Sequence, residues 1–119
     1  MENTEVKISK VLKQLGILPN ILGYEYLKEA IDMMLKDDSV IRKGVTKVMY
    51  PAIARKFTTE SSRVERAIRH AIERACIRGD AELIEDIFGH GISADSGKPT
   101  NSEFIACVSE YLKLSTTNE

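Results

Sequence analysis

Three side chains within one short stretch, Glu65, Arg66 and Arg69, have the chemistry needed to recognise the edges of DNA bases. The planar guanidinium of arginine presents two parallel N–H donors that match the O6 and N7 acceptors of guanine. A glutamate carboxylate can accept a hydrogen bond from the N4 amino group of cytosine. Because phosphate repels a carboxylate, a glutamate on a DNA-facing surface is better explained by base reading than by general affinity. We therefore predict that these three side chains read bases in double-stranded DNA.

The residues around them predict a helix over about 62–78 with one apolar and one polar side. On a helical wheel at about 100° per residue, the apolar positions form a stripe as wide as a core-facing surface. This stripe consists of Val64, Ile68, Ala71 and Ala75, with Ala67 and Ile72 at its edges. The opposite side carries Ser62, Arg66, Arg69 and Glu73, with Glu65 on one flank and Arg63 and His70 on the other. We expect Ser61 or Ser62 to cap the helix and Gly79 to end it.

A preceding helix and a short polar turn complete the pattern of a helix-turn-helix motif. We expect the preceding helix over about 46–57, with Pro51 either kinking it or marking a fresh start in its first turn. The turn covers 58–61. Ala54 stands ten residues before Val64, where the close approach of two helices needs a small side chain. Many such turns carry glycine, so Thr58 predicts a different turn geometry here.

The distribution of charge indicates a partner that is a polyanion. The whole chain has a net charge of −1, but residues 42–78 hold ten Lys and Arg against three Glu, a net charge of +7. Residues 79–119 are acidic, with two Lys and eight Asp and Glu. A basic centre in a neutral chain is typical of a surface that binds DNA phosphates. The side chains that we expect to hold phosphates and fix the register are Lys43, Lys47, Ser62, Arg63, His70 and Arg74.

The rest of the chain predicts an all-α fold, a compact bundle of about six helices in a single domain spanning residues 1–119. Apolar residues recur at intervals of three and four, not two. Besides the two helices above, we expect helices over about 4–15, 23–36, 81–88 and 100–114. Asp80 is placed to cap the helix over 81–88, and 115–119 is expected to be a flexible tail. Val6 is assigned to the apolar face of the first helix.

Several classes of protein and site are disfavoured by what the sequence lacks. No apolar run is long enough to span a membrane and Met1–Lys10 has no signal-peptide core, so we expect a cytoplasmic protein. Cys76 and Cys107 are interpreted as free thiols. Together with His70 and His90 they lack zinc-ligand spacing, and residues 89–98 do not match a phosphate-binding loop. We therefore expect no metal, cofactor or small-molecule substrate. The tyrosines at 24, 26 and 50 have the spacing of core residues.

Three alternatives remain open from the residues alone. The charged side of the 62–78 helix has the spacing of a salt-bridged solvent face, through Glu65 with Arg69 and Glu73 with Arg66 or Arg69. A helical protein-interaction module could use the same basic face for an acidic partner. The third alternative is an enzyme acting on nucleic acid, for which no carboxylate cluster or metal-ligand spacing is present.

The stretch TKVMYPAIARKFTTESSRVERAIRHAIERA, over residues 46–75, resembles the C-terminal effector domains of the stage-zero sporulation protein A family, response regulators of endospore formation. The resemblance extends to GYEYLKEAI at 23–31 and KPTNSEFIA at 98–106. It implies a six-helix domain that binds boxes of the form TGNCGAA near promoters, to activate or repress transcription. It also implies that the helix over 62–78 lies in the major groove, with Glu65 and Arg66 at the base-reading positions.

The resemblance further implies cooperation with an RNA polymerase sigma factor. The acidic helix after Gly79, with the loop to about Ile92, is the candidate surface for that contact (79–92), although an ordinary capped surface helix would have the same composition. A second copy of the domain is the expected partner on tandem boxes. The chain shows no repeating βα pattern of a receiver domain. We therefore expect a fragment that phosphorylation does not regulate as it stands.

Overall fold

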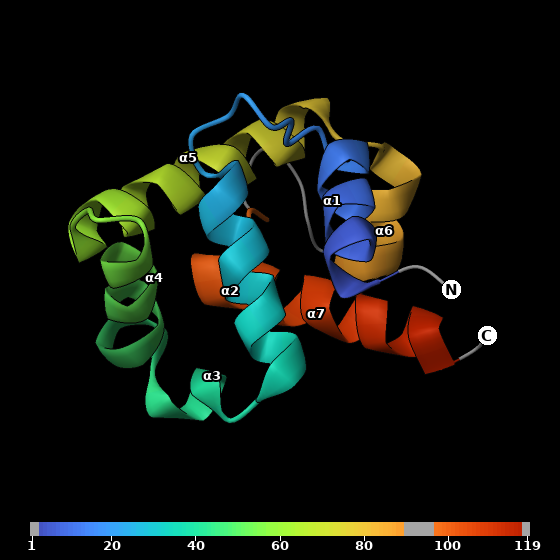
Figure 1. The fold of residues 1–119 in the computed structure, drawn as a ribbon. Coiled ribbons are helices and arrows are strands. Elements are labelled where there is room, and N and C mark those ends of the chain that lie inside the picture. Colours follow the sequence, from blue (N-terminus) through green and yellow to red (C-terminus); the bar gives the residue numbers. More distant parts are fainter. Residues whose placement is uncertain (1–2, 90–96, 118–119) are drawn as a thin grey trace.

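The computed structural model describes residues 3–89 and 97–117, and within these ranges the chain forms helices and no strand. The all-α class predicted from the sequence is confirmed. Figure 1 shows the elements, which follow in the order α1 (Thr4–Gln14), α2 (Tyr24–Lys36), α3 (Val40–Lys43), the π-helix η1 (Val45–Met49), α4 (Tyr50–Lys56), α5 (Ser61–Arg78), α6 (Ala81–Phe88) and α7 (Asn101–Thr117). None of the described helices is long and apolar enough to cross a membrane.

The helix expected over 46–57 is instead two segments. Val45–Met49 forms a π-helix, and α4 starts anew at Tyr50 with Pro51 in its first turn. Of the two roles considered for Pro51, the fresh start is therefore correct. Proline suits this position because the first residues of a helix have no intrahelical partner for their N–H groups. The short helix α3 just before η1 was not expected from the sequence.

The helix ends show where local signals succeed and where they fail. Asp80 caps α6 as predicted, since its Oδ1 accepts from the backbone N–H groups of Glu82 and Leu83 at 2.9 and 3.3 Å. The predicted cap of α5 is wrong, because Glu60 holds the N-cap position and makes no side-chain capping hydrogen bond. Helix α7 continues to Thr117, beyond the expected end at Leu114, while 118–119 lie outside the described residues.

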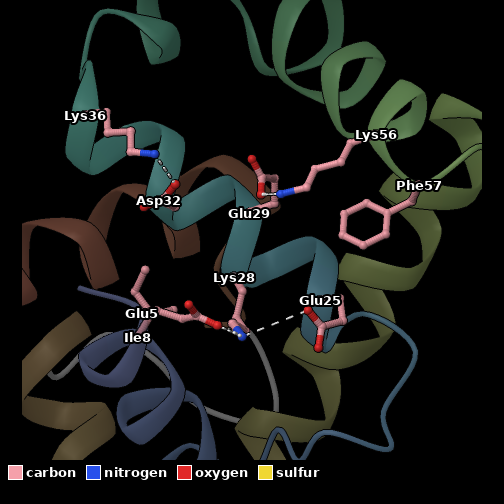
Figure 2. A pocket seen from close by; sticks show the side chains of 9 residues that line it. All are labelled: Glu5, Ile8, Glu25, Lys28, Glu29, Asp32, Lys36, Lys56 and Phe57. Atoms are coloured by element: carbon pink, nitrogen blue, oxygen red, sulfur yellow. Dashed lines mark hydrogen bonds and ion pairs between the residues drawn. The ribbon is translucent and has the colours of Figure 1, made fainter. Parts of the chain in front are cut away.

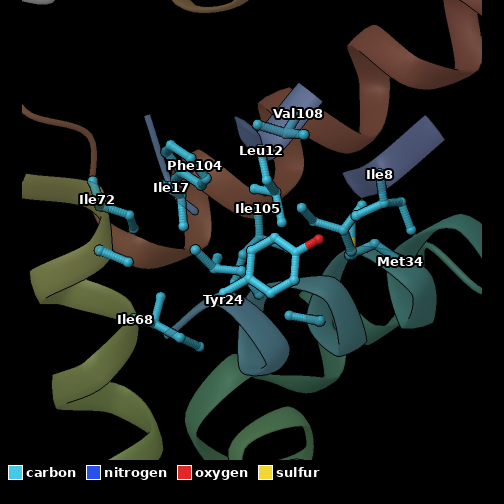
Figure 3. Close-up of a cluster of buried hydrophobic side chains, with 14 of the residues drawn as sticks. Ile8, Leu12, Ile17, Tyr24, Met34, Ile68, Ile72, Phe104, Ile105 and Val108 are labelled. Atoms are coloured by element: carbon cyan, nitrogen blue, oxygen red, sulfur yellow. The ribbon is translucent and has the colours of Figure 1, made fainter. Parts of the chain in front are cut away.

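Apolar faces of α1, α2, α5 and α7 meet in one core, part of which Figure 3 shows in close-up. Its fully buried side chains include Leu12, Leu27, Ile31, Ile68, Ile72, Phe104 and Ile105. Tyr24 and Tyr50 are also buried, which confirms their assignment to the core. Val6 was assigned wrongly, because it is 40% exposed and lies in the first turn of α1, at the edge of that helix's buried face.

The start of α2 lies directly against α5. A Cβ atom added to Gly23 would come within 2.5 Å of the Ala67 carbonyl oxygen, so only glycine fits at this approach. Further along α2, the Tyr26 ring meets the Phe57 ring edge to face, with centroids 5.3 Å apart. Helix α2 therefore packs against both helices of the predicted helix-turn-helix motif.

Candidate nucleic-acid interface

The turn between α4 and α5 sets the angle between these two helices. The N–H of Thr59 donates to the Ala54 carbonyl at 2.9 Å, and the N–H of Thr58 donates to the Arg55 carbonyl at 3.4 Å. These two bonds form a Schellman motif, whose residue after the C-cap is left-handed and usually glycine. Here that residue is Thr58, with φ of 53°. The expectation of a different geometry is thus wrong at this position, because threonine adopts the left-handed conformation that glycine would take.

Thr58→Gly should make the domain more stable by about 1 kcal/mol, because a β-branched residue in the left-handed region carries a steric cost that glycine avoids. Thr58 is exposed, so the change removes no buried contact. Denaturant unfolding of the variant and of Thr59→Gly measures the effect. Thr59 has no positive φ, so glycine there should only lower the free energy of unfolding. A loss of stability in Thr58→Gly would contradict the assigned strain.

Helix α5 has the two-sided character that its sequence predicts. Its buried residues are Val64, Ala67, Ile68, Ala71, Ile72 and Ala75, the six positions of the predicted stripe. Ser62, Arg63, Arg66, Arg69 and His70 are exposed on the other side, and Glu65 is half-buried. The core therefore holds α5 by one face and presents the other, charged face to solvent.

The exposed side of α5 contains one internal ion pair. The Arg69 guanidinium donates to the Glu65 carboxylate one helical turn away, as their spacing predicts. Among the described residues, Arg66 has no acidic partner, and neither it nor Arg69 pairs with Glu73. Arg66 thus offers its full guanidinium fork to a ligand, whereas Arg69 must share its donors with Glu65.

A hollow on each flank of α5 collects the candidate residues. One is lined by Arg63, Arg66 and His70 of α5 together with Leu22, Tyr26, Thr59 and Ala67. The other is lined by Glu65, Arg69, Ile72 and Glu73 of α5 together with Thr46, Tyr50 and residues 98–102. The structure thus brings together Arg63, Arg66 and His70 on one side and Glu65 and Arg69 on the other.

The second hollow includes residues that the sequence did not single out for the site. Lys98, Thr100 and Asn101 lie at or just before the start of α7, and Thr46 lies in η1. Two signals in the sequence concern this segment, the expected start of a helix at about residue 100 and the resemblance over residues 98–106. Neither signal shows which other helix the segment contacts.

The other side chains predicted to contact DNA phosphates differ in their exposure and in their acidic partners. Lys47 is exposed on η1 and has no acidic partner among the described residues, whereas Lys43 at the end of α3 lies 3.8 Å from an Asp37 carboxylate oxygen. Arg63 Nε lies 3.9 Å from a Glu60 oxygen. Arg74 is half-buried, and its Nε is covered without a hydrogen-bond partner. Among the described residues, Lys47 is therefore the one of these four cations that is exposed and has no acidic partner.

A third hollow, between α1, α2 and the end of α4, contains lysines that are already neutralised (Figure 2). Lys56 of the basic segment pairs with Glu29 at 2.5 Å, Lys28 lies 3.2 Å from Glu5, and Lys36 lies 2.9 Å from Asp32. Lys56 thus contributes less to a phosphate-binding surface than its place in the sequence suggests.

The cysteines have the features of structural thiols. Both are free and half-buried, and burial raises the pKa of the Cys76 and Cys107 thiols. A raised pKa keeps a thiol protonated and unreactive. His90 lies outside the described residues, and within them no group of three potential ligands could hold a metal ion.

Comparison with known families identifies the arrangement. Residues 8–112 match the family described as Sporulation initiation factor Spo0A C terminal. The match begins in α1 and ends in α7, so it includes the whole helix-turn-helix region and both hollows beside α5. It confirms the resemblance noted from residues 46–75. The chain therefore belongs to the Spo0A C-terminal family, the DNA-binding effector domains of response regulators that control transcription in sporulation.

Proposed function

We propose that this domain binds DNA sequence-specifically, with α5 in the major groove of boxes of the form TGNCGAA. The observation that carries the proposal is the exposed face of α5, where Arg66 lies opposite six buried positions and has no acidic partner within residues 3–89 and 97–117. Arg66 lies in the second turn of the helix, near the N-terminal end that reaches deepest into the groove in helix-turn-helix complexes. In this arrangement Arg66 reads a guanine and Glu65 reads a cytosine.

Whether Arg69 contacts DNA depends on its ion pair with Glu65. Its ion pair with Glu65 occupies the carboxylate that would accept from cytosine. On the specific box, Glu65 turns to the base and releases Arg69 to a neighbouring base or phosphate. On other sequences the pair persists, and both side chains contribute little. The ion pair thus couples the contact of Glu65 with cytosine to the contact of Arg69 with DNA.

Phosphate contacts fix the register of the reading helix. Ser62, Arg63 and His70 hold the backbone on one flank of α5, and Lys47 holds it from η1. Lys43 and Arg74 add weaker contacts, because Lys43 lies near Asp37 and the Arg74 Nε is covered. These contacts are independent of sequence and supply most of the affinity for random DNA.

Two protein partners complete the proposal. The exposed acidic side chains of α6, Glu82, Glu85 and Asp86, make the 79–92 surface the candidate contact for an RNA polymerase sigma factor. Of this surface, residues 90–92 lie outside the described structure. A second copy of the domain binds beside the first on tandem boxes.

Affinity for the TGNCGAA duplex should fall steeply as salt rises, because each neutralised phosphate contributes about −0.9 to the slope of log K against log salt. With Lys47 and Arg63 as the main charged contacts and Lys43 and Arg74 as lesser ones, we expect a slope of about −2 to −4. Titrations of the TGNCGAA duplex and a scrambled duplex at several salt concentrations measure it. A flat plot with no preference for the box would contradict the proposal and favour a module for an acidic protein.

A further inference from the structure

A single side-chain amide connects the last helix to both helices of the helix-turn-helix. The Asn101 amide nitrogen donates to the Tyr50 hydroxyl at 2.9 Å and to the backbone carbonyl of Glu65 at 3.1 Å. Asn101 begins α7, Tyr50 begins α4, and Glu65 lies in the second turn of α5. An amide nitrogen has two N–H donors and a carbonyl oxygen has two lone pairs, so both bonds form without breaking the α5 ladder.

The start of α7 is built to hold this amide in place. The N–H of Thr100 donates to the Glu103 carboxylate at 2.9 Å, and the N–H of Glu103 donates to the Thr100 hydroxyl at 3.1 Å. This reciprocal capping box fixes the backbone on either side of Asn101. Tyr50, which accepts one of the two hydrogen bonds, is held by burial, because the residue is only 5% exposed. The capping box therefore restrains Asn101, and burial restrains Tyr50.

The bridge acts at the one peptide group that joins the two proposed base-reading residues. The carbonyl of Glu65 belongs to the peptide bond between Glu65 and Arg66. A rotation of α5 about its axis would move both side chains relative to the groove and would also break this hydrogen bond. Specific contacts need side chains held to within about 0.5 Å, and hydrogen bonds from outside the site supply such restraint.

The surroundings of Tyr50 agree with a close electrostatic contact between the bridge and the reading helix. Burial is the largest cause of the raised pKa of the Tyr50 phenol, which the Asn101 hydrogen bond lowers in part. The charges of Glu65 and Arg69 also act on the Tyr50 pKa, in opposite directions. The phenol therefore stays neutral and remains an acceptor for Asn101 at neutral pH.

We propose that Asn101, together with Tyr50, is a positioning residue for base recognition, which holds the turn of α5 that carries Glu65 and Arg66 in its reading orientation. The inference rests on the proposed function of α5. It gives α7 a part in DNA specificity without any contact between α7 and DNA. Aspartate cannot replace Asn101, because an ionised carboxylate has no donor and would repel the Glu65 carbonyl oxygen.

The test compares base discrimination with stability in Asn101→Ala, Asn101→Asp and Tyr50→Phe. Glu110→Gln and Tyr24→Phe are the matched controls, because Glu110 is an exposed residue further along α7 that lines neither hollow beside α5, and Tyr24 is another buried tyrosine. Neither control side chain forms a hydrogen bond with any of the described residues. Each protein is titrated with the TGNCGAA duplex, its single-base variants and a scrambled duplex, at a temperature well below its own melting temperature.

We expect both Asn101 variants to lose about fivefold or more of the discrimination at the Glu65 and Arg66 positions. Affinity for the scrambled duplex should change by less than about twofold, since the phosphate contacts remain. Tyr50→Phe should show a smaller loss of the same kind, and the controls should show none. In a Glu65→Ala background, Asn101→Ala should cause no further loss at the cytosine position, because the contact that it positions is absent.

Two results would overturn the inference in distinguishable ways. If the parent protein discriminates among the duplexes and the Asn101 variants melt lower but keep that discrimination, Asn101 stabilises the fold and positions nothing. If the parent itself binds all duplexes equally, the proposed function fails, and the inference fails with it. Should Asn101→Ala not fold, the nearly isosteric Asn101→Asp and the conservative Tyr50→Phe decide, and full discrimination in both contradicts the proposal.

Discussion

Val64→Asp should unfold the domain or detach α5 from its core, because it places a carboxylate where the structure leaves no access to water. Val64 is 0% exposed and belongs to the same buried cluster as Ala54 of α4 and Ile53 beside it. An unpaired carboxylate at such a site costs about 3 kcal/mol or more. Domains of this size are stable by only about 5–15 kcal/mol, so the loss is a large share of the total.

The same substitution at an exposed valine is the matched control. Val6 is 40% exposed in the first turn of α1, where a negative charge interacts favourably with the helix dipole. Val6→Asp should therefore change the melting temperature little. Thermal unfolding by circular dichroism measures both variants. If Val64→Asp melts like the parent protein and binds the box normally, the assignment of the buried side of α5 is wrong.

Arg66→Ala should lose about 1–3 kcal/mol of discrimination at one guanine of the box, because it removes a bidentate contact. Affinity for random DNA should change less. Lys47→Ala, on η1 and outside the reading face, should weaken binding to all duplexes by similar factors and reduce the salt slope by about one unit. Arg78→Ala removes an exposed arginine at the far end of α5 and serves as the control. A panel of single-base-substituted duplexes separates these patterns.

Glu65→Ala completes this comparison with a third pattern. The variant removes a carboxylate that phosphate repels and frees Arg69 from its ion pair. Affinity for random DNA should therefore rise, while preference for cytosine at one position relaxes. If Arg66→Ala, Lys47→Ala and Glu65→Ala all shift every duplex by the same factor, α5 is a phosphate clamp and the sequence is read elsewhere.

The features that follow from the sequence alone are those set by residues close together in the chain. The spacing of Val64, Ile68, Ala71 and Ala75 decides which side of α5 is buried, because a helix turns by about 100° per residue. Asp80 caps α6 through groups two and three residues away. The Glu65–Arg69 pair follows from a spacing of four. Each involves one helix or one turn, so no knowledge of the fold is needed.

Only the tertiary structure decides which charged and polar groups remain accessible and which are taken by other helices. The sequence places Lys56 in the basic segment, but in the structure it pairs with Glu29 of α2, 27 residues away. The left-handed Thr58 and the π-helical η1 are conformations that the residue types at these positions do not predict. Asn101 lies 51 residues from Tyr50 and 36 from Glu65, and its bonds exist only because α7 packs across the motif. Periodicity carries no information on such distant pairs, since their meeting depends on the burial of every apolar face at once.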